Sequence, residues 1–218
     1  MQESETSEKI TPRQLMELKL SVRVARIKNG PLNKAVEALL RGSGFYEANH
    51  PASLGHHHAY EWGLLQHTVE VCDYALAGSP DEASLDVVLA AALCHDVMKT
   101  RDYELKQFEP GQEIPTRSLW ACGLPAGAQM RWVCSDYYRK IHHIHGSFEL
   151  FSRHAYGHCV DPELVEAVGH AILAHHGPVA EWGSAIRPQT LEAQIVHNAD
   201  YISAHFGATK DKPSWTKS

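Results

Sequence analysis

Residues 85–99 read LDVVLAAALCHDVMK, and this stretch decides the fold that the sequence predicts. Its apolar residues recur at the spacing of one face of an α-helix, namely Leu85, Val88, Leu89, Ala92 and Leu93. His95 and Asp96 follow directly, where this helix is expected to end. Adjacent helical positions are about 100° apart, so both side chains can face one metal ion only at a fraying helix end. Such a pair taken alone more often has a purely structural role, and a metal site is the alternative that the other residues must support.

Three further stretches combine helical spacing of apolar residues with residues that begin or end helices. They are residues 62–77, 161–176 and 190–202. Asp161-Pro162 is an N-cap followed by proline at the first helical position, and Gly177-Pro178 stops the same helix. Thr190 is the expected N-cap of the last helix.

The N-terminal segment predicts two more helices. Thr11-Pro12-Arg13-Gln14 has the form of a capping box, and a helix through Leu15, Leu18 and Val22 would follow. The alternation of residues 18–24 also fits a β-strand, so both interpretations stay open. A second helix is expected from Leu32 to about Leu40.

Residues 108–129 contain three prolines and three glycines, which predicts a long loop or an insertion and makes the segment a candidate lid. Helices are expected to resume near Met130 and again from Ser147. There is no internal repeat and no alternation of strands with helices. The sequence therefore predicts an all-α, single-domain helical bundle over residues 11–206, between a disordered tail at 1–10 and a C-terminal tail at 207–218.

The composition narrows the class of protein. Among 218 residues, 44% are hydrophobic and 21% are charged, which is typical of a globular domain. No apolar run is long enough for a membrane span, and the polar N-terminus resembles no secretory signal. A net charge of −6 gives no general basic surface for long nucleic acids. The five cysteines form no CxxC pair, so we expect reduced thiols and a cytoplasmic protein: Cys72, Cys94, Cys122, Cys134 and Cys159.

Histidine is the unusual part of the composition. The chain has 16 histidines against eight tyrosines. Histidine is the commonest metal ligand in proteins and a frequent acid–base residue, so this excess favours metal or acid–base chemistry. Three expected helices contribute His67, the pair His95-Asp96, and Asp200, in that order along the chain. A carboxylate on a half-buried helix face, as at Asp200, needs a partner.

The order of these residues resembles that of the HD-domain metal-dependent phosphohydrolase superfamily. Further motifs are similar to the HD domain of bacterial 3′–5′ exoribonucleases, and together they cover close to half of the chain. They are HHAY (57–60), GLLQHT (63–68), EV (70–71), HAILAHHG (170–177), EWGS (181–184) and IVHNAD (195–200). Several ordered motifs are far more specific than one.

The resemblance implies a centre of one or two divalent metal ions. One ion would be held by His67, His95, Asp96 and Asp200. A second would share Asp96 and add His143, His175 and His176, with His142 and His145 as alternatives to His143. Mixed nitrogen and oxygen ligands suit Mn, Fe, Co or Ni better than Mg or Ca.

The resemblance also implies a phosphohydrolase or phosphodiesterase that acts on a nucleotide or short oligonucleotide through a metal-activated water. Asp96 and Lys99 would be catalytic, and Lys99, Arg101 and His58 would bind substrate, although Lys99 and Arg101 also fit plain surface charges. Neighbouring histidines would support the ligands or pack in the core, namely His57, His58, His170 and His197. Trp120, Trp132 and Tyr137-Tyr138 fit either base stacking or the core.

The sequence departs from this family in two ways. The exoribonucleases carry an OB-type domain before the HD domain, whereas only about 40 residues precede the motifs here, so we expect that domain to be missing. Trp62 and Met98 stand where the family pattern has glycine, and both are expected to narrow the site. The segment around Trp132 and Arg139 also resembles HD-like domains of conjugative relaxase proteins. The alternative function is therefore a non-catalytic, metal-organised module that binds a nucleotide or a partner.

Overall fold

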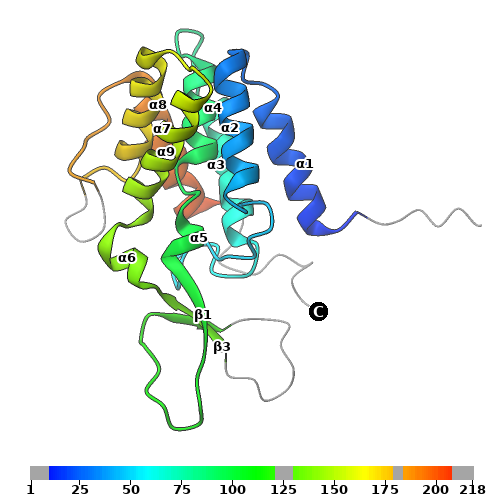
Figure 1. Ribbon diagram of the computed structural model, residues 1–218, viewed down its shortest axis with the longest axis vertical. Helices are drawn as coiled ribbons and strands as arrows, with labels where there is room; N and C mark the ends of the chain where they lie inside the picture. Colours follow the sequence, from blue (N-terminus) through cyan, green and yellow to red (C-terminus); the bar gives the residue numbers. More distant parts are fainter. Residues whose placement is uncertain (1–9, 121–129, 179–183, 208–218) are drawn as a thin grey trace, which may run out of the picture.

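The computed structural model describes residues 10–120, 130–178 and 184–207, so the expected tails and most of the EWGS motif lie outside the described residues. Most of the described chain is helical, which confirms the predicted all-α class, and a small sheet is added to it (Figure 1). The helices are α1 (Pro12–Val24), α2 (Gly30–Gly42), α3 (Gly63–Ala77), α4 (Leu85–Cys94), α5 (Lys99–Asp102), α6 (Asp136–Lys140), α7 (His143–Gly157), α8 (Pro162–Ala174) and α9 (Leu191–Phe206).

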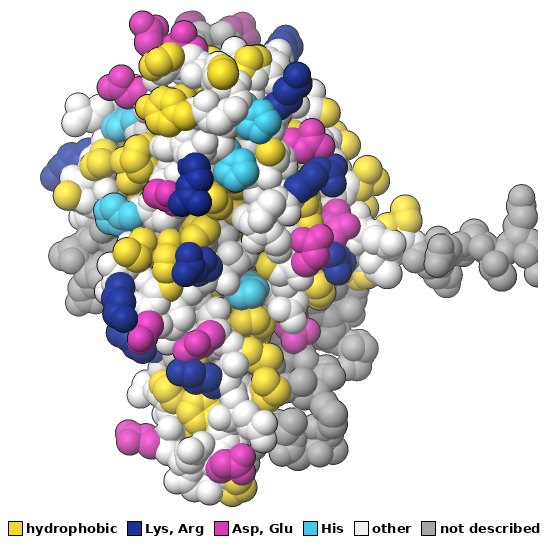
Figure 2. All heavy atoms as spheres, viewed as in Figure 1, with side chains coloured by type: hydrophobic (Ala, Val, Ile, Leu, Met, Phe, Trp, Pro, Cys, Tyr) yellow, Lys and Arg dark blue, Asp and Glu magenta, His cyan; other side chains and the backbone are white. Residues whose placement is uncertain are grey.

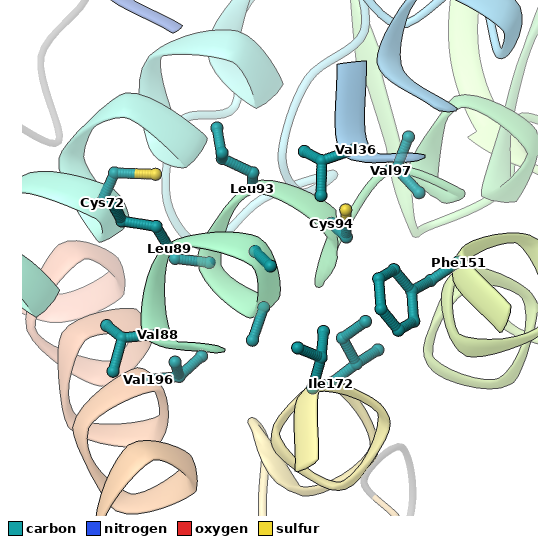
Figure 3. Packing of buried hydrophobic residues seen from close by; sticks show 14 of the residues in the cluster. Val36, Cys72, Val88, Leu89, Leu93, Cys94, Val97, Phe151, Ile172 and Val196 are labelled. Carbon is teal, nitrogen blue, oxygen red and sulfur yellow. The ribbon is translucent and has the colours of Figure 1, made fainter. Parts of the chain in front are cut away.

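Helix α4 is the centre of the bundle. Every residue from Val87 to Cys94 is buried, as expected for a helix that is apolar on all sides. It packs against α2, α3, α7, α8 and α9, and Figure 3 shows side chains from these helices converging on it. Labelled examples from the surrounding helices are Val36, Cys72, Phe151, Ile172 and Val196. Burying one such side chain stabilises the fold by roughly 1.5–3 kcal/mol.

The first helix forms as its capping box predicts. Thr11 accepts a hydrogen bond from the Gln14 backbone, and the Gln14 side chain accepts one from the Thr11 backbone, so the strand interpretation is wrong. The apolar residues that indicated this helix, Leu15, Leu18 and Val22, are exposed. The residues facing the core instead follow the i, i+4, i+8 spacing of a helix and are Met16, Leu20 and Val24.

The region from 103 to 134 contains strands that the sequence did not predict. β1 (Tyr103–Gln107), β2 (Ser118–Trp120) and β3 (Met130–Cys134) form an antiparallel sheet in the order β1-β3-β2. The helix expected near Met130 is therefore wrong, because that segment pairs with both other strands. Residues 108–129 are likewise not wholly a loop, although 121–129 lie outside the described chain. The sheet projects from the bundle beside α5 and α6 (Figure 1).

Helix α7 begins earlier than expected, at His143 rather than Ser147. Its N-cap, His142, has a φ angle of 67°, a conformation that non-glycine residues rarely adopt and that clusters at functional sites. The preceding short helix α6 starts where the Ser135 hydroxyl accepts a hydrogen bond from the Tyr138 backbone. Only Ile141 and His142 connect α6 to α7, and this short connection fixes the orientation of the first turn of α7.

The surface is mixed in charge. On the face shown in Figure 2, acidic and basic side chains are interspersed among apolar ones. Within the described ranges, each helix is either shorter or more polar than a bilayer-spanning helix would need to be. Cys72, Cys94, Cys134 and Cys159 are free thiols, whereas Cys122 lies outside the described residues.

The core position of α7 can be tested at Phe151, which is fully buried. We expect Phe151→Ala to lower the free energy of unfolding by about 3–5 kcal/mol, through lost burial and the cavity that remains. Tyr156→Ala on the same helix is the matched control, since Tyr156 is 62% exposed. Urea denaturation followed by circular dichroism measures both. Equal losses for the two variants would contradict this packing.

Candidate metal centre

Five helices bring the predicted ligands to one place. His67 lies in the second turn of α3, and Asp200 lies in the middle of α9. The remaining ligands lie at helix ends, His95-Asp96 after α4, His143 at the start of α7, and His175-His176 after α8. Helix ends suit this purpose, because adjacent residues there can turn toward one point. Except for the partly exposed His176, all seven side chains are buried.

The Asp96 carboxylate is the centre of the cluster. Its Oδ2 lies 3.4 Å from His67 Nε2 and 3.3 Å from His95 Nε2. Its Oδ1 lies 3.2 Å from His143 Nε2 and 3.6 Å from His175 Nε2. Each oxygen therefore faces its own pair of imidazoles, and the ligand atoms fall into two groups that share Asp96.

Asp200 approaches both groups from α9. Its Oδ1 is 3.0 Å from His67 Nε2 and 3.8 Å from His95 Nε2. Its Oδ2 is 3.9 Å from His176 Nε2. One oxygen of this second carboxylate therefore faces the first group, and the other oxygen faces His176 of the second group.

The other ring nitrogen of each buried histidine is held by the protein. His95 Nδ1 donates to the Ala92 carbonyl at 2.8 Å, and His175 Nδ1 donates to the Ile172 carbonyl at 2.6 Å. A carbonyl only accepts, so in the neutral rings these hydrogens lie on Nδ1 and the bare Nε2 faces Asp96. His143 Nδ1 is 2.6 Å from Asp102 Oδ2. Such contacts behind the ligands fix ring orientation at metal sites.

The donor set fits a metal ion. Buried polar groups normally have a hydrogen-bond partner, yet within the described chain His143 Nε2 and His175 Nε2 have none. Both nitrogens present a lone pair to the Asp96 carboxylate, which carries lone pairs of its own. A cation between them satisfies all of these atoms at once. Imidazole nitrogen and carboxylate oxygen together are ligands of divalent transition metals.

Charge keeps the two carboxylates ionised. Burial alone would raise the pKa of Asp96, but the Lys99 ammonium and the His95 and His143 imidazoles hold it well below its ordinary value. Lys99 Nζ is 2.6 Å from Asp96 Oδ2, and Lys99 is itself buried. The pKa of Asp200 is also low despite burial, because His67 donates to it. Both groups are therefore ready to bind a cation at neutral pH.

Burial also keeps most of the imidazoles neutral. It lowers the pKa of His143 and of His176 well below the ordinary value, and it lowers the pKa of His95. His67 is the exception, since hydrogen bonds to Asp200 and Asp96 overcome its burial and raise its pKa. Metal ligation needs the neutral ring, so these three histidines and the two ionised carboxylates form a site already close to its binding form.

A cavity of about 750 Å³ opens onto this cluster. His143, His175, His176 and Asp200 line its wall, together with Lys99. The loop 52–59 forms one side. The inserted region, α6 and α9 contribute further residues of the wall, namely Tyr103, Arg117, Cys134, Tyr138, Tyr201, Ala204 and His205.

Several residues predicted near the site lie elsewhere. Arg101 is exposed, with its guanidinium 4.3 Å from the centre of the Tyr137 ring, and it does not line the cavity. His170 accepts a hydrogen bond from the Gln189 backbone. Trp62 and Met98, which were expected to narrow the site, are also absent from its described wall. Of the three candidate histidines in the 142–145 segment, His143 is the one whose Nε2 faces Asp96.

The supporting histidines divide into two layers. His57 lines the cavity, whereas His58 is buried behind it and contacts Glu70 Oε2 at 3.1 Å. His197 also lines the cavity, and its Nδ1 donates to the His175 carbonyl at 2.6 Å. Tyr138 lies in the wall, but Trp132 is buried against His50, while the side chain of Trp120 lies outside the description.

Sequence reasoning missed Asp102, Ser203 and Arg117. Asp102 contacts His143, which lies 41 residues later in the sequence, and a pair so far apart leaves no local pattern to recognise. Ser203 holds His67 Nδ1 at 3.0 Å and lies three residues after Asp200, so the shared helix face was a usable signal. Arg117 reaches the cavity from a segment that was expected to be a loop.

Comparisons with known proteins agree with this geometry. The HD domain family matches residues 64–205. The chain is similar to the 3′–5′ exoribonuclease YhaM of Listeria welshimeri, with 29% identity over 185 residues that cover 83% of this chain and 51% of the relative. The YhaM protein of Bacillus subtilis is 26% identical over 183 residues, with the same coverage.

A relative with a different substrate is the dihydroneopterin 2′,3′-cyclic phosphate phosphodiesterase of Methanocaldococcus jannaschii. It is 28% identical over 174 residues, which cover 77% of this chain and 56% of the relative. The chain spans about half the length of the curated relatives it matches. No solved structure matches it.

Metal binding predicts a gain in stability that depends on Asp96. A divalent ion at 100 times its dissociation constant should raise the free energy of unfolding by about 2.7 kcal/mol, because it binds only the folded chain. Asp96→Asn should abolish the gain, since both ligand groups use this carboxylate. Asp136→Asn, at an exposed carboxylate on α6, is the control. Thermal unfolding with Mn, Fe, Co and Ni measures the effect, and a wild-type midpoint unmoved by all four would contradict the site.

Proposed function

Since this chain belongs to the HD domain family, we propose that it is a metal-dependent phosphodiesterase that hydrolyses phosphoester bonds of a nucleotide or short oligonucleotide. The observation that carries the proposal is the Asp96 carboxylate, whose two oxygens face separate imidazole pairs beside a cavity of about 750 Å³. The names of the relatives support hydrolysis of phosphodiesters. The match covers 51% and 56% of the length of those two relatives.

The proposed ligand sets follow the two groups. One divalent ion is held by His67, His95, Asp96 and Asp200. A second is held by Asp96, His143, His175 and His176. Ions bound there supply a water of lowered pKa and neutralise phosphate oxygens during attack. The nitrogen-rich ligands favour Mn, Fe, Co or Ni.

Lys99 has two roles in this proposal. Its ammonium lies 2.6 Å from Asp96 Oδ2, and the residue also lines the cavity. It therefore balances the buried carboxylate and offers a positive charge to a phosphate that enters. A fixed cation in a site that excludes water stabilises developing negative charge more strongly than one in solvent.

The outer wall supports a substrate that carries a base. Tyr201 and His205 stack at 4.0 Å between ring centres, and both line the cavity. Tyr138 and His142 form a second ring pair at 5.0 Å, and Arg117 Nη1 donates to the Tyr138 hydroxyl at 3.1 Å. Aromatic faces stack on nucleobases of any sequence, and an arginine beside them adds charge for a phosphate. A bare phosphomonoester would leave these groups unused.

The proposal predicts turnover that depends on added metal. We expect purified protein supplied with Mn, Fe, Co or Ni to cleave at least one member of a panel of mononucleotides, cyclic nucleotides, and short RNA and DNA. Chelation should abolish the activity, and Asp96→Asn should remain inactive at every metal concentration. Product release is followed by chromatography. Tight binding of a panel member without any turnover would instead favour a non-catalytic binding module.

Replacing Lys99 tests its charge separately from metal binding. Lys99→Met keeps the length of the side chain, and we expect it to lower kcat/KM by roughly 100- to 1,000-fold, the usual effect of removing one electrostatic contact in a reaction site. Metal content, measured by elemental analysis, should stay near the wild-type value. Lys106→Met in β1 is the control, because Lys106 is largely exposed. Wild-type kinetics for Lys99→Met would exclude the proposed role.

A further inference from the structure

Glu70 lies one turn after His67 on α3, outside both groups of proposed ligands. Its side chain is 15% exposed, and its carboxylate contacts three other side chains. Gln66 Nε2 donates to Oε1 at 2.9 Å. Ser203 Oγ and His58 Nε2 each lie 3.1 Å from Oε2. The end of α9 packs so closely that a Cβ on Gly207 would lie 2.3 Å from Oε2.

His67 differs from the other buried histidines in what holds its Nδ1. His95 and His175 use backbone carbonyls, which can only accept a hydrogen bond. His67 Nδ1 lies 3.0 Å from a hydroxyl, Ser203 Oγ, which can donate or accept. A serine alone would therefore leave both neutral forms of the His67 ring available.

The Glu70 carboxylate removes this ambiguity. An ionised carboxylate only accepts, so the Ser203 hydroxyl hydrogen points at Glu70 Oε2. The lone pairs of Ser203 Oγ then face His67 Nδ1, so the ring keeps a hydrogen on Nδ1 when Nε2 gives up its own. Nε2, which lies 3.4 Å from Asp96 and 3.0 Å from Asp200 and donates to them in the metal-free protein, is then the nitrogen that can give up its hydrogen to take a metal ion.

We propose that Glu70 is a positioning residue that selects, through the Ser203 hydroxyl, the form of His67 that can bind a metal ion. The inference rests on the metal centre of the proposed function. The opposite orientation of the hydroxyl would place the ring hydrogen on Nε2 and direct it at the metal position. Contacts behind the ligands of this kind commonly change metal affinity by about 10- to 100-fold when they are removed.

The same carboxylate orders the histidine loop. Because Glu70 accepts from His58 Nε2, the bare nitrogen of that ring is Nδ1, which lies 3.1 Å from His57 Nδ1. The hydrogen between these two nitrogens therefore belongs to His57, which lines the cavity. One carboxylate thus sets the ring forms on α3 and in the loop before it.

Two variants separate this role from general folding. Glu70→Gln keeps the shape but adds an amide donor, which lets the Ser203 hydroxyl turn toward His67. Ser203→Ala removes the link itself. We expect each variant to lower Mn²⁺ affinity about 10- to 100-fold in calorimetric titration, with the loss confined to one binding step. The double variant should lose no more than Ser203→Ala alone, because Glu70 acts through Ser203.

Imidazole nitrogen NMR provides the direct readout. Spectra of metal-free protein should show a hydrogen on His67 Nδ1 in the wild type and its loss from Nδ1 in Glu70→Gln. Glu192→Gln is the control, since Glu192 is a hydrogen-bonded glutamate on α9 that contacts the Ser84 backbone outside the site.

The two proposals fail in different ways. If Glu70→Gln and Ser203→Ala both fold, keep wild-type Mn²⁺ affinity and keep the hydrogen on His67 Nδ1, the role of Glu70 is excluded while the metal centre stands. If the wild-type protein binds no Mn²⁺, the metal centre is contradicted, and the metal-free spectra still decide whether Glu70 selects the ring form.

Discussion

Asp96 is a buried carboxylate placed among buried imidazoles, and the arrangement of the bundle follows from satisfying it. An ionised carboxylate removed from water is costly unless charge and hydrogen bonds compensate it. Here Lys99 supplies the nearest charge, and imidazoles from α3, α4, α7 and α8 converge on its two oxygens. The helices must therefore meet with their ends and inner faces at one point. An apolar α4 makes this possible, because it packs on all sides while it delivers Asp96.

The group that contacts Nδ1 of each ligand histidine depends on where that histidine lies along its helix. His95 and His175 each donate to a carbonyl three residues earlier, one of the carbonyls that a helix end leaves free. His143 begins its helix and has no preceding turn, so it relies on Asp102 from another element. His67 lies inside α3, where the backbone carbonyls are already used, and it relies on Ser203 and Glu70. The position of a histidine along its helix thus determines what kind of support it needs.

Sequence reasoning recovered what is encoded in local spacing and ordered motifs. The helices, their caps and the ligand order could be predicted because each depends on neighbours a few residues apart. The covered face of α1 could not be chosen from the sequence, since Leu15, Leu18 and Val22 form an equally regular stripe and the packing of α1 on α3 and α4 decides which stripe is covered. Met130–Cys134 became a strand because β1 and β2 pair with it, which the segment itself does not reveal. The contact of Asp102 with His143 could not be predicted for the same reason, since the two residues are 41 positions apart.

The inserted sheet and the bundle divide the site between them. All proposed ligands come from the helices and the turns that end them, whereas Arg117 and Tyr138 reach the cavity from the inserted region and the short helix that follows it. The ligand cluster is held by buried contacts from several helices, so its geometry tolerates little change. The part of the cavity wall that contains Arg117 and Tyr138 is more exposed and lies across the cavity from the cluster. In the proposed enzyme, changes in that wall would alter which phosphoester is accepted without disturbing the proposed ligands, which offers a physical reason why relatives similar in sequence carry the names of different phosphodiesterases.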